Sequence, residues 1–93
     1  MRITELAIGK QNGPCEETTV DYTEPPAIFT TRWGPMLPNT LYVTDSLGNN
    51  ITASVLVGWD YAENKLIFDT LKLSRSPEVT IRYTFDDVRF ADL

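Results

Sequence analysis

Apolar and polar residues alternate most strictly at positions 79–85. Val79, Ile81, Tyr83 and Phe85 occupy the odd positions, and Thr or Arg side chains occupy the positions between them. Successive side chains of a strand point to opposite faces of its sheet. This period of two therefore predicts a strand with one buried and one solvated face.

A β-hairpin is predicted for residues 51–69. In residues 51–59 the alternation puts four apolar side chains on one face, namely Ala53, Val55, Val57 and Trp59. A polar turn at 60–64, which includes an Asn, leads into a second apolar run at 65–69. Two strand-like runs joined by such a turn are typical of an antiparallel hairpin.

Both faces of this hairpin carry apolar side chains. Leu56 and Ile67 fall on the faces opposite to the neighbouring apolar residues of their own strands. Either a second sheet or loop covers both sides, as in a sandwich, or one side is a subunit contact. Large apolar patches on small soluble proteins commonly mark interfaces.

Shorter strand-like runs lie at 3–8, 18–22, 27–33 and 41–44. Turn-forming residues end three of them: Pro25 and Pro26 follow the second, Gly34 and Pro35 follow the third, and a polar segment at 45–50 follows the fourth. The pattern predicts an all-β fold, a small antiparallel β-sandwich or barrel of six to seven short strands with extended terminal segments.

A length of 93 residues allows a single domain, 1–93. We expect a looser N-terminal strand and arm at 1–26, a β core at 27–85 and a C-terminal tail at 86–93. Residues 9–17 are polar, with two glycines and a proline, and predict a loop. A domain of this size buries only about 60–65% of its unfolded surface, so its thin core favours help from a partner.

Charge and composition narrow the functional classes. The formal net charge of −5 repels phosphate backbones and anionic headgroups, so we expect neither a nucleic-acid nor a membrane partner. With no His and one Cys, the chain can form neither an internal disulfide nor a thiolate metal cluster. We expect synthesis in a reducing cytoplasm, because no secretory apolar segment is present. We expect Cys15 to be an unreactive loop residue, because the two glutamates that follow it disfavour a thiolate.

Acidic residues gather near turns, namely Asp45, Asp60, Asp69, Asp86 and Asp87. Paired catalytic carboxylates need a cleft that holds them about 5–9 Å apart, and this chain has little material for one. We expect no enzyme, no metal site and no cofactor. Asp45, Asn49 and Asn50 supply oxygen atoms around Gly48, but turn formation explains them better than an ion site.

Trp33 lies in a proline-stiffened loop, 32–38, that also carries Met36 and Leu37. Aromatic residues, Met and Arg are enriched at protein interfaces. At the other end of the chain, Phe90 and Leu93 must dock on their own domain as a lid or on a neighbour as a clasp. We predict a protein interface at Trp33, Met36, Leu37, Phe90 and Leu93.

Residues 59–68 (WDYAENKLIF), followed after a proline by residues 79–85 (VTIRYTF), resemble a recurring pattern of tailed-bacteriophage structural proteins. In that pattern a D-Y-A turn and strand precede a proline and a V-x-[apolar]-x-Y-x-[aromatic] strand. The resemblance covers about a third of the chain and transfers no residue with a known role. It implies a small all-β virion part, either a capsid decoration or cement protein, commonly trimeric with terminal arms, or a neck or tail module.

We therefore predict a non-enzymatic virion structural protein that homo-oligomerises as a trimer and binds a larger lattice such as a major capsid protein. By adding buried area between capsomers, it would stabilise the assembled state. One alternative is a neck or tail module, and another is a monomeric carbohydrate- or protein-binding β-sandwich with Trp33 and Tyr61 as stacking aromatics. A third is a small hydrolase that uses Asp60 and Asp69.

Overall fold

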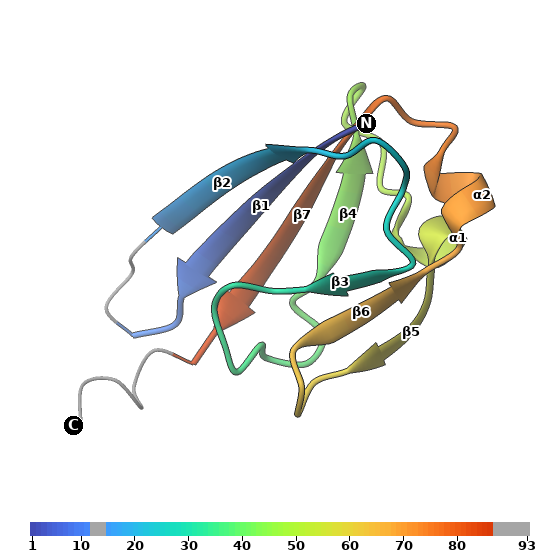
Figure 1. Cartoon of the computed structure of the whole chain (residues 1–93). Helices are drawn as coiled ribbons and strands as arrows, with labels where there is room; N and C mark the ends of the chain where they lie inside the picture. Colours follow the sequence, from blue (N-terminus) through green and yellow to red (C-terminus); the bar gives the residue numbers. More distant parts are fainter. Residues whose placement is uncertain (12–14, 87–93) are drawn as a thin grey trace.

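The computed structural model describes residues 1–11 and 15–86. Within them the chain forms seven strands and two short helices (Figure 1). In chain order the elements are β1 (Arg2–Gly9), β2 (Cys15–Asp21), β3 (Ile28–Thr30), β4 (Tyr42–Asp45), α1 (Thr52–Val55), β5 (Leu56–Asp60), β6 (Lys65–Phe68), α2 (Thr70–Leu73) and β7 (Glu78–Phe85).

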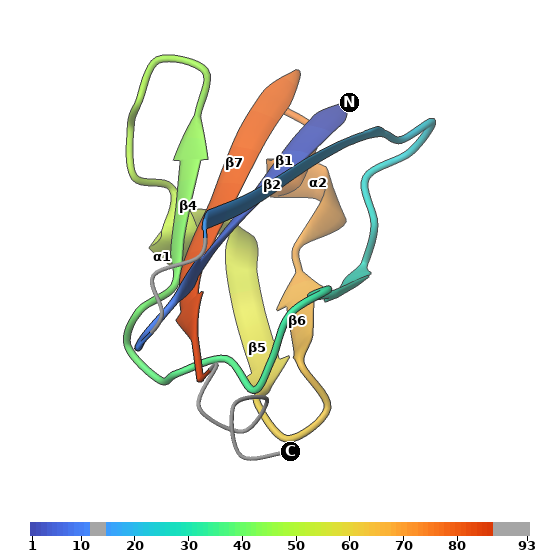
Figure 2. The same cartoon turned by 90° about the vertical axis from the view of Figure 1, so that its left-hand side faces the viewer.

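The strands form two open sheets, layered one over the other (Figures 1 and 2). The larger sheet has the order β2-β1-β7-β4, and the smaller sheet has the order β3-β6-β5. All neighbours are antiparallel except β1 and β7, the first and last strands, which run parallel at the centre of the larger sheet. The all-β prediction is confirmed, with a sandwich in place of a closed barrel.

The core lies between the sheets and is built from alternate residues of their strands. The odd positions of residues 79–85 are buried, as the sequence pattern predicts. From the smaller sheet come Phe29, Leu66 and Phe68. The two Phe rings meet edge to face with centroids 6.5 Å apart, which is a favoured aromatic geometry.

The N-terminal segment is built into the fold more firmly than the sequence indicates. β1 lies between β2 and β7, and its residues Ile3 and Ala7 belong to the core. Residues 15–17, for which composition predicts a loop, pair with β1 as the start of β2. Because this pairing satisfies backbone groups and leaves polar side chains in solvent, it leaves no apolar signal in the sequence. Cys15 is exposed at the start of this edge strand.

The predicted strand at 51–59 is wrong in its first half. Residues 52–55 form α1, because the Thr52 hydroxyl accepts from the Val43 amide (2.8 Å) and donates to the Asn50 side chain (2.7 Å). The hairpin of β5 and β6 is confirmed, with Asn64 in the left-handed region of its turn (φ 57°). A bulge between Leu56 and Gly58 turns Val57 outward, away from the predicted apolar face.

Turns and long-range contacts shorten other strands. β3 has three residues where the sequence predicts seven. Thr31 still donates its amide to the Asn64 carbonyl (2.8 Å), but beyond it the amides of Arg32 and Trp33 donate to the side chains of Glu5 and Tyr83. After β4 the chain returns through a single bridge between Thr44 and Asn50. Gly48, at φ +84°, provides the left-handed residue of this turn.

Candidate interaction surfaces

A buried carboxylate ties the Trp33 loop to the larger sheet. Glu5 of β1 is only 4% exposed, and it accepts hydrogen bonds from the Tyr83 hydroxyl and from the Arg32 amide (2.8 Å). Tyr83 in turn accepts from the Trp33 amide (3.2 Å). Burial, and secondly the Glu5 carboxylate, raises the pKa of the Tyr83 hydroxyl well above its ordinary value. Sequence analysis missed Glu5, although its inward position between two apolar residues of a strand was a signal.

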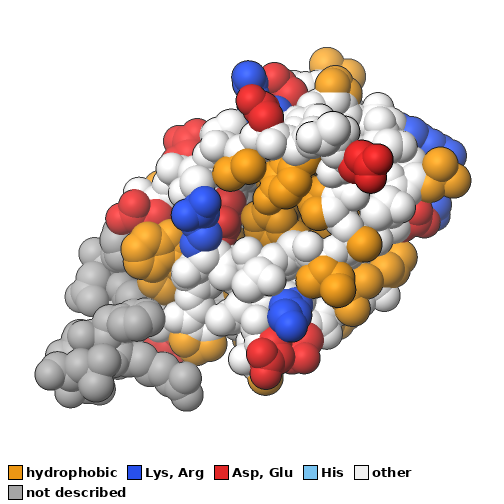
Figure 3. All heavy atoms as spheres, viewed as in Figure 1, with side chains coloured by type: hydrophobic (Ala, Val, Ile, Leu, Met, Phe, Trp, Pro, Cys, Tyr) orange, Lys and Arg blue, Asp and Glu red, His pale blue; other side chains and the backbone are white. Residues whose placement is uncertain are grey.

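Glu5 and Arg32 also line a hollow of about 180 Å³ between β1, β2 and β3. Figure 3 shows hydrophobic side chains at the floor of a hollow on this face of the molecule. The Arg32 Nε lies 4.0 Å from the Glu5 carboxylate. The Glu5 carboxylate is therefore engaged by groups of the fold itself and is not available to a ligand.

The structure separates the predicted residues of the Trp33 loop. The Trp33 ring stacks on Phe85 with centroids 5.6 Å apart and remains partly exposed. Leu37 is half-buried and donates its amide to the Thr84 carbonyl (2.9 Å). Met36 is 2% exposed and pairs with Phe85 through an isolated bridge, so it is a core residue and not part of an exposed contact surface.

Phe90 and Leu93, the other predicted interface residues, lie outside the described residues, as does most of the tail at 86–93. The Met36 prediction fails because a loop stiffened by Pro35 and Pro38 can still point one side chain inward. Here the Met36 amide donates to the Asn64 side chain (3.3 Å), which holds the backbone against the β5–β6 turn.

The outer side of the smaller sheet carries three neighbouring aliphatic side chains, which we name the aliphatic sheet face: Ile28, Val57 and Ile67. Their exposures are 59%, 62% and 41%. Ile28 and Ile67 are direct cross-strand partners, and the bulge places Val57 beside Gly58, the partner of Ile67. Of the two alternatives that the pattern left open, cover by a second sheet or loop does not hold for Ile67, which is exposed, whereas Leu56 is half-buried against the core.

A second exposed region lies on the side of the sandwich where β4 and β5 are the edge strands. It is a hollow of about 270 Å³, which we name the aromatic groove, lined by Asn39, Leu41, Tyr42, Thr52, Leu56, Trp59 and Tyr61. Trp59, which the sequence pattern places on the apolar face of its strand, is 54% exposed here. Trp33, the other predicted stacking aromatic, does not line this groove.

Three of the acidic residues near turns, Asp45, Asp60 and Asp69, have local structural partners. Asp45 accepts from the amides of Leu47 (3.0 Å) and Asn49 (2.9 Å), and the bonds from Asn49 hold the pKa of its carboxyl below the ordinary value. Asp60 accepts from the Glu63 amide (3.2 Å).

Asp69 caps α2, because its carboxylate accepts from the amides of Leu71 (3.1 Å) and Lys72 (3.2 Å). Over residues 1–11 and 15–86, no group of three or more His, Cys, Asp or Glu side chains is placed to hold a metal ion.

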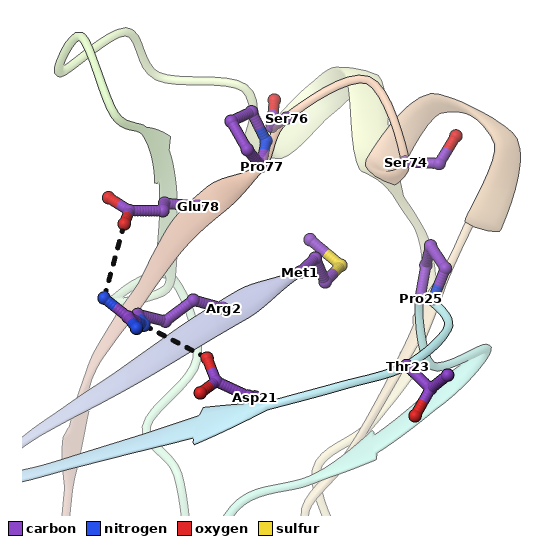
Figure 4. A pocket seen from close by; sticks show the side chains of 9 residues that line it. All are labelled: Met1, Arg2, Asp21, Thr23, Pro25, Ser74, Ser76, Pro77 and Glu78. Carbon is purple, nitrogen blue, oxygen red and sulfur yellow. Dashed lines mark hydrogen bonds and ion pairs between the residues drawn. The ribbon is translucent and has the colours of Figure 1, made fainter.

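A wide, open hollow of about 590 Å³ surrounds the start of β1 (Figure 4). The Arg2 side chain at this hollow reaches Asp21 on one side (3.1 Å) and Glu78 on the other (3.6 Å). The hydrogen bond to Asp21 and the charge of Asp21 raise the pKa of the Arg2 guanidinium. Because two carboxylates already face this guanidinium, the hollow is a poor site for an anionic ligand.

Comparison of the chain with protein-family models, with curated proteins and with solved structures finds no match. In the part of the chain that the structure describes, no helix has the length and apolar content needed to cross a membrane.

Proposed function

We propose that this chain is a non-enzymatic structural protein that binds copies of itself through the aliphatic sheet face. The observation that carries the proposal is the exposure of Ile28, Val57 and Ile67 side by side on three paired strands. Fully burying one such side chain is worth about 1.5–3 kcal/mol. In a symmetric oligomer every subunit buries these three side chains at an equivalent contact.

The local roles of the acidic residues support binding over catalysis. Asp60 and Asp69, the pair that a hydrolase would use, each accept backbone amides that shape a turn or begin a helix. Carboxylates engaged in this way stabilise the fold and need no substrate to explain them.

We propose a virion as the setting, with the protein made in the host cytoplasm and acting as a trimeric capsid decoration or cement protein on a major capsid lattice. The support is the resemblance of residues 59–68 and 79–85 to tailed-bacteriophage structural proteins. In the structure these segments are the β5–β6 hairpin and the central strand β7. Trp33 and Leu37, on a different loop, are the residues that we propose for contact with the larger partner. A neck or tail module would use the same surfaces.

Light scattering on the purified protein tests self-association. We expect an oligomer for the wild type and for Leu47→Asp, which alters an aliphatic side chain that is 85% exposed but lies in the β4 turn. Ile67→Asp places a charge in the proposed interface and should give a monomer. A wild type that stays monomeric at about 100 µM, well above the Kd of a stable oligomer, contradicts the proposal.

Electron microscopy tests the virion setting. Particles that carry the protein should show added density at seams between capsomers, and particles that lack it should show none there. Density confined to the neck or tail would favour the alternative location. Particles without any such density would refute the virion setting and leave the self-association result unaffected.

A further inference from the structure

The aromatic groove lies where the sandwich is open. β4 ends the larger sheet and β5 ends the smaller one, so no further strand of the described chain covers the core on this side (Figure 2). Tyr42 comes from β4, Trp59 comes from β5, and Tyr61 comes from the turn after β5. The volume of about 270 Å³ is close to the lower limit of small-molecule sites, about 300 Å³.

Two rings in the groove form an angled platform. The centroids of Trp59 and Tyr61 are 5.8 Å apart, and their planes are inclined by 43°. More than half of Trp59 is exposed to solvent, although burial of an aromatic ring is among the largest sources of stability in a small domain.

Polar groups around these rings are free to bind a ligand. No hydrogen-bond partner within the described residues engages the hydroxyls of Tyr42 and Tyr61, the indole N–H of Trp59 or the side-chain amide of Asn39. Thr52 differs, because its hydroxyl is already committed within the fold. The groove therefore combines apolar ring faces with unpaired donors and acceptors at its margin, as ligand sites do.

We infer that the aromatic groove binds an uncharged oligosaccharide built of equatorially substituted hexopyranose rings. In such a ring the axial C–H groups form an apolar face that stacks on aromatic side chains, and the hydroxyls at the ring edge need hydrogen-bond partners. None of the residues that line the groove is charged. With a net charge of −5, the chain also repels nucleotides and acidic sugars, which leaves neutral sugars as the matching class.

This inference goes beyond self-association. None of the three residues of the aliphatic sheet face lines the groove, so either property can fail without the other. A different occupant, an extended peptide added to the β4 or β5 edge, would be held by backbone hydrogen bonds and would not depend on the Trp59 ring. Dependence on Trp59 therefore separates a saccharide from a peptide.

Cellotetraose and chitotriose, both β-1,4-linked and neutral, are suitable probes, with sorbitol as a polyol that has no ring face. We expect the indole N–H signal of Trp59 in a ¹H–¹⁵N spectrum to shift on titration, with a Kd in the millimolar range, while that of Trp33 stays still. Trp33→Phe identifies the two indole signals and serves as the matched control, because it alters a second partly exposed Trp outside the groove.

Because Trp59→Ala removes the indole signal itself, the Kd of this variant is read from the backbone amide signals of the other residues that line the groove. This Kd should be at least about tenfold higher than that of the wild type, and Trp33→Phe should leave the Kd unchanged. Tyr42→Ala, at an exposed position on β4, provides a second test if the Trp59 variant loses its dispersed spectrum. Binding of either oligosaccharide supports the inference, and the preferred probe shows whether an acetamido group adds affinity. No shift at about 10 mM sugar, an equal shift with sorbitol, or unchanged binding by the folded Trp59→Ala protein overturns it.

Discussion

The contact between Glu5 and Tyr83 joins residues 78 positions apart and holds the Trp33 loop in place. Glu5→Gln tests how much this contact contributes, because it keeps the side-chain volume and removes the charge. The new amide group would place two N–H donors beside the Arg32 guanidinium, where a carboxylate oxygen lies 4.0 Å from Nε in the wild type. A buried donor would then lack an acceptor.

The structure sets the expected magnitude. Glu5 accepts two hydrogen bonds in a site that is 4% exposed, and hydrogen bonds to a charged group contribute about 1.5–3 kcal/mol each. Both bonds reach the same carboxylate oxygen, Oε2, so both can still form to the Gln carbonyl oxygen, but they lose the strengthening by charge, and the new amide group lacks an acceptor. We therefore expect Glu5→Gln to lower the free energy of unfolding by about 2–3 kcal/mol, and Tyr83→Phe by about 2 kcal/mol.

A double-mutant cycle isolates the pair. Urea unfolding followed by Trp fluorescence gives the free energy for the wild type, for Glu5→Leu, for Tyr83→Phe and for the double variant. We expect a coupling of about 1.5–3 kcal/mol, because removing both partners leaves fewer unpaired polar groups than removing one. A coupling below about 0.5 kcal/mol, or Glu5→Gln within about 0.5 kcal/mol of the wild type, would refute the reasoning.

Three further predictions concern stability. The folded-state pKa of Tyr83 lies above its unfolded value near 10. The contribution of Tyr83 to the free energy of unfolding is therefore complete below about pH 10 and falls by about 1.4 kcal/mol per pH unit above it. Above about pH 10 the urea midpoint should drop more steeply for the wild type than for Tyr83→Phe. Asp69→Ala removes the cap of α2 and should cost about 1 kcal/mol, whereas Asp69→Asn should retain most of it. Gly34→Ala should cost about 1–3 kcal/mol and lower the thermal midpoint, because its Cβ would clash with the Asn64 side chain, whose oxygen is held by the Met36 amide; an unchanged midpoint would contradict this.

Strand identity is the part of this fold that the sequence predicts well. Residues 79–85 alternate because β7 has one face in the core, and the β5–β6 hairpin follows from an apolar run on either side of a turn that needs a left-handed residue, Asn64. Such signals are local, since each depends on residues within one strand or one turn. The same reasoning fails at residues 52–55, where side-chain hydrogen bonds of Thr52 stabilise a helical turn without altering the apolar pattern.

The two interaction surfaces were only partly accessible to sequence reasoning. Apolar residues on both sides of the hairpin left open whether Ile67 is covered or exposed, and Val57 became its neighbour only through a bulge. Trp59 looked like a core residue because alternation alone does not show that β5 is an edge strand. Met36 looked like a contact residue because composition does not reveal which way a loop side chain points.

Periodicity alone established that this chain is a β protein with its apolar residues on defined strand faces, because that pattern requires only local geometry. The parallel pairing of β1 with β7, the burial of Glu5 beneath the Trp33 loop and the opening between β4 and β5 arise from contacts between distant segments. Those contacts depend on which strand lies beside which, and a one-dimensional pattern carries no information on that order.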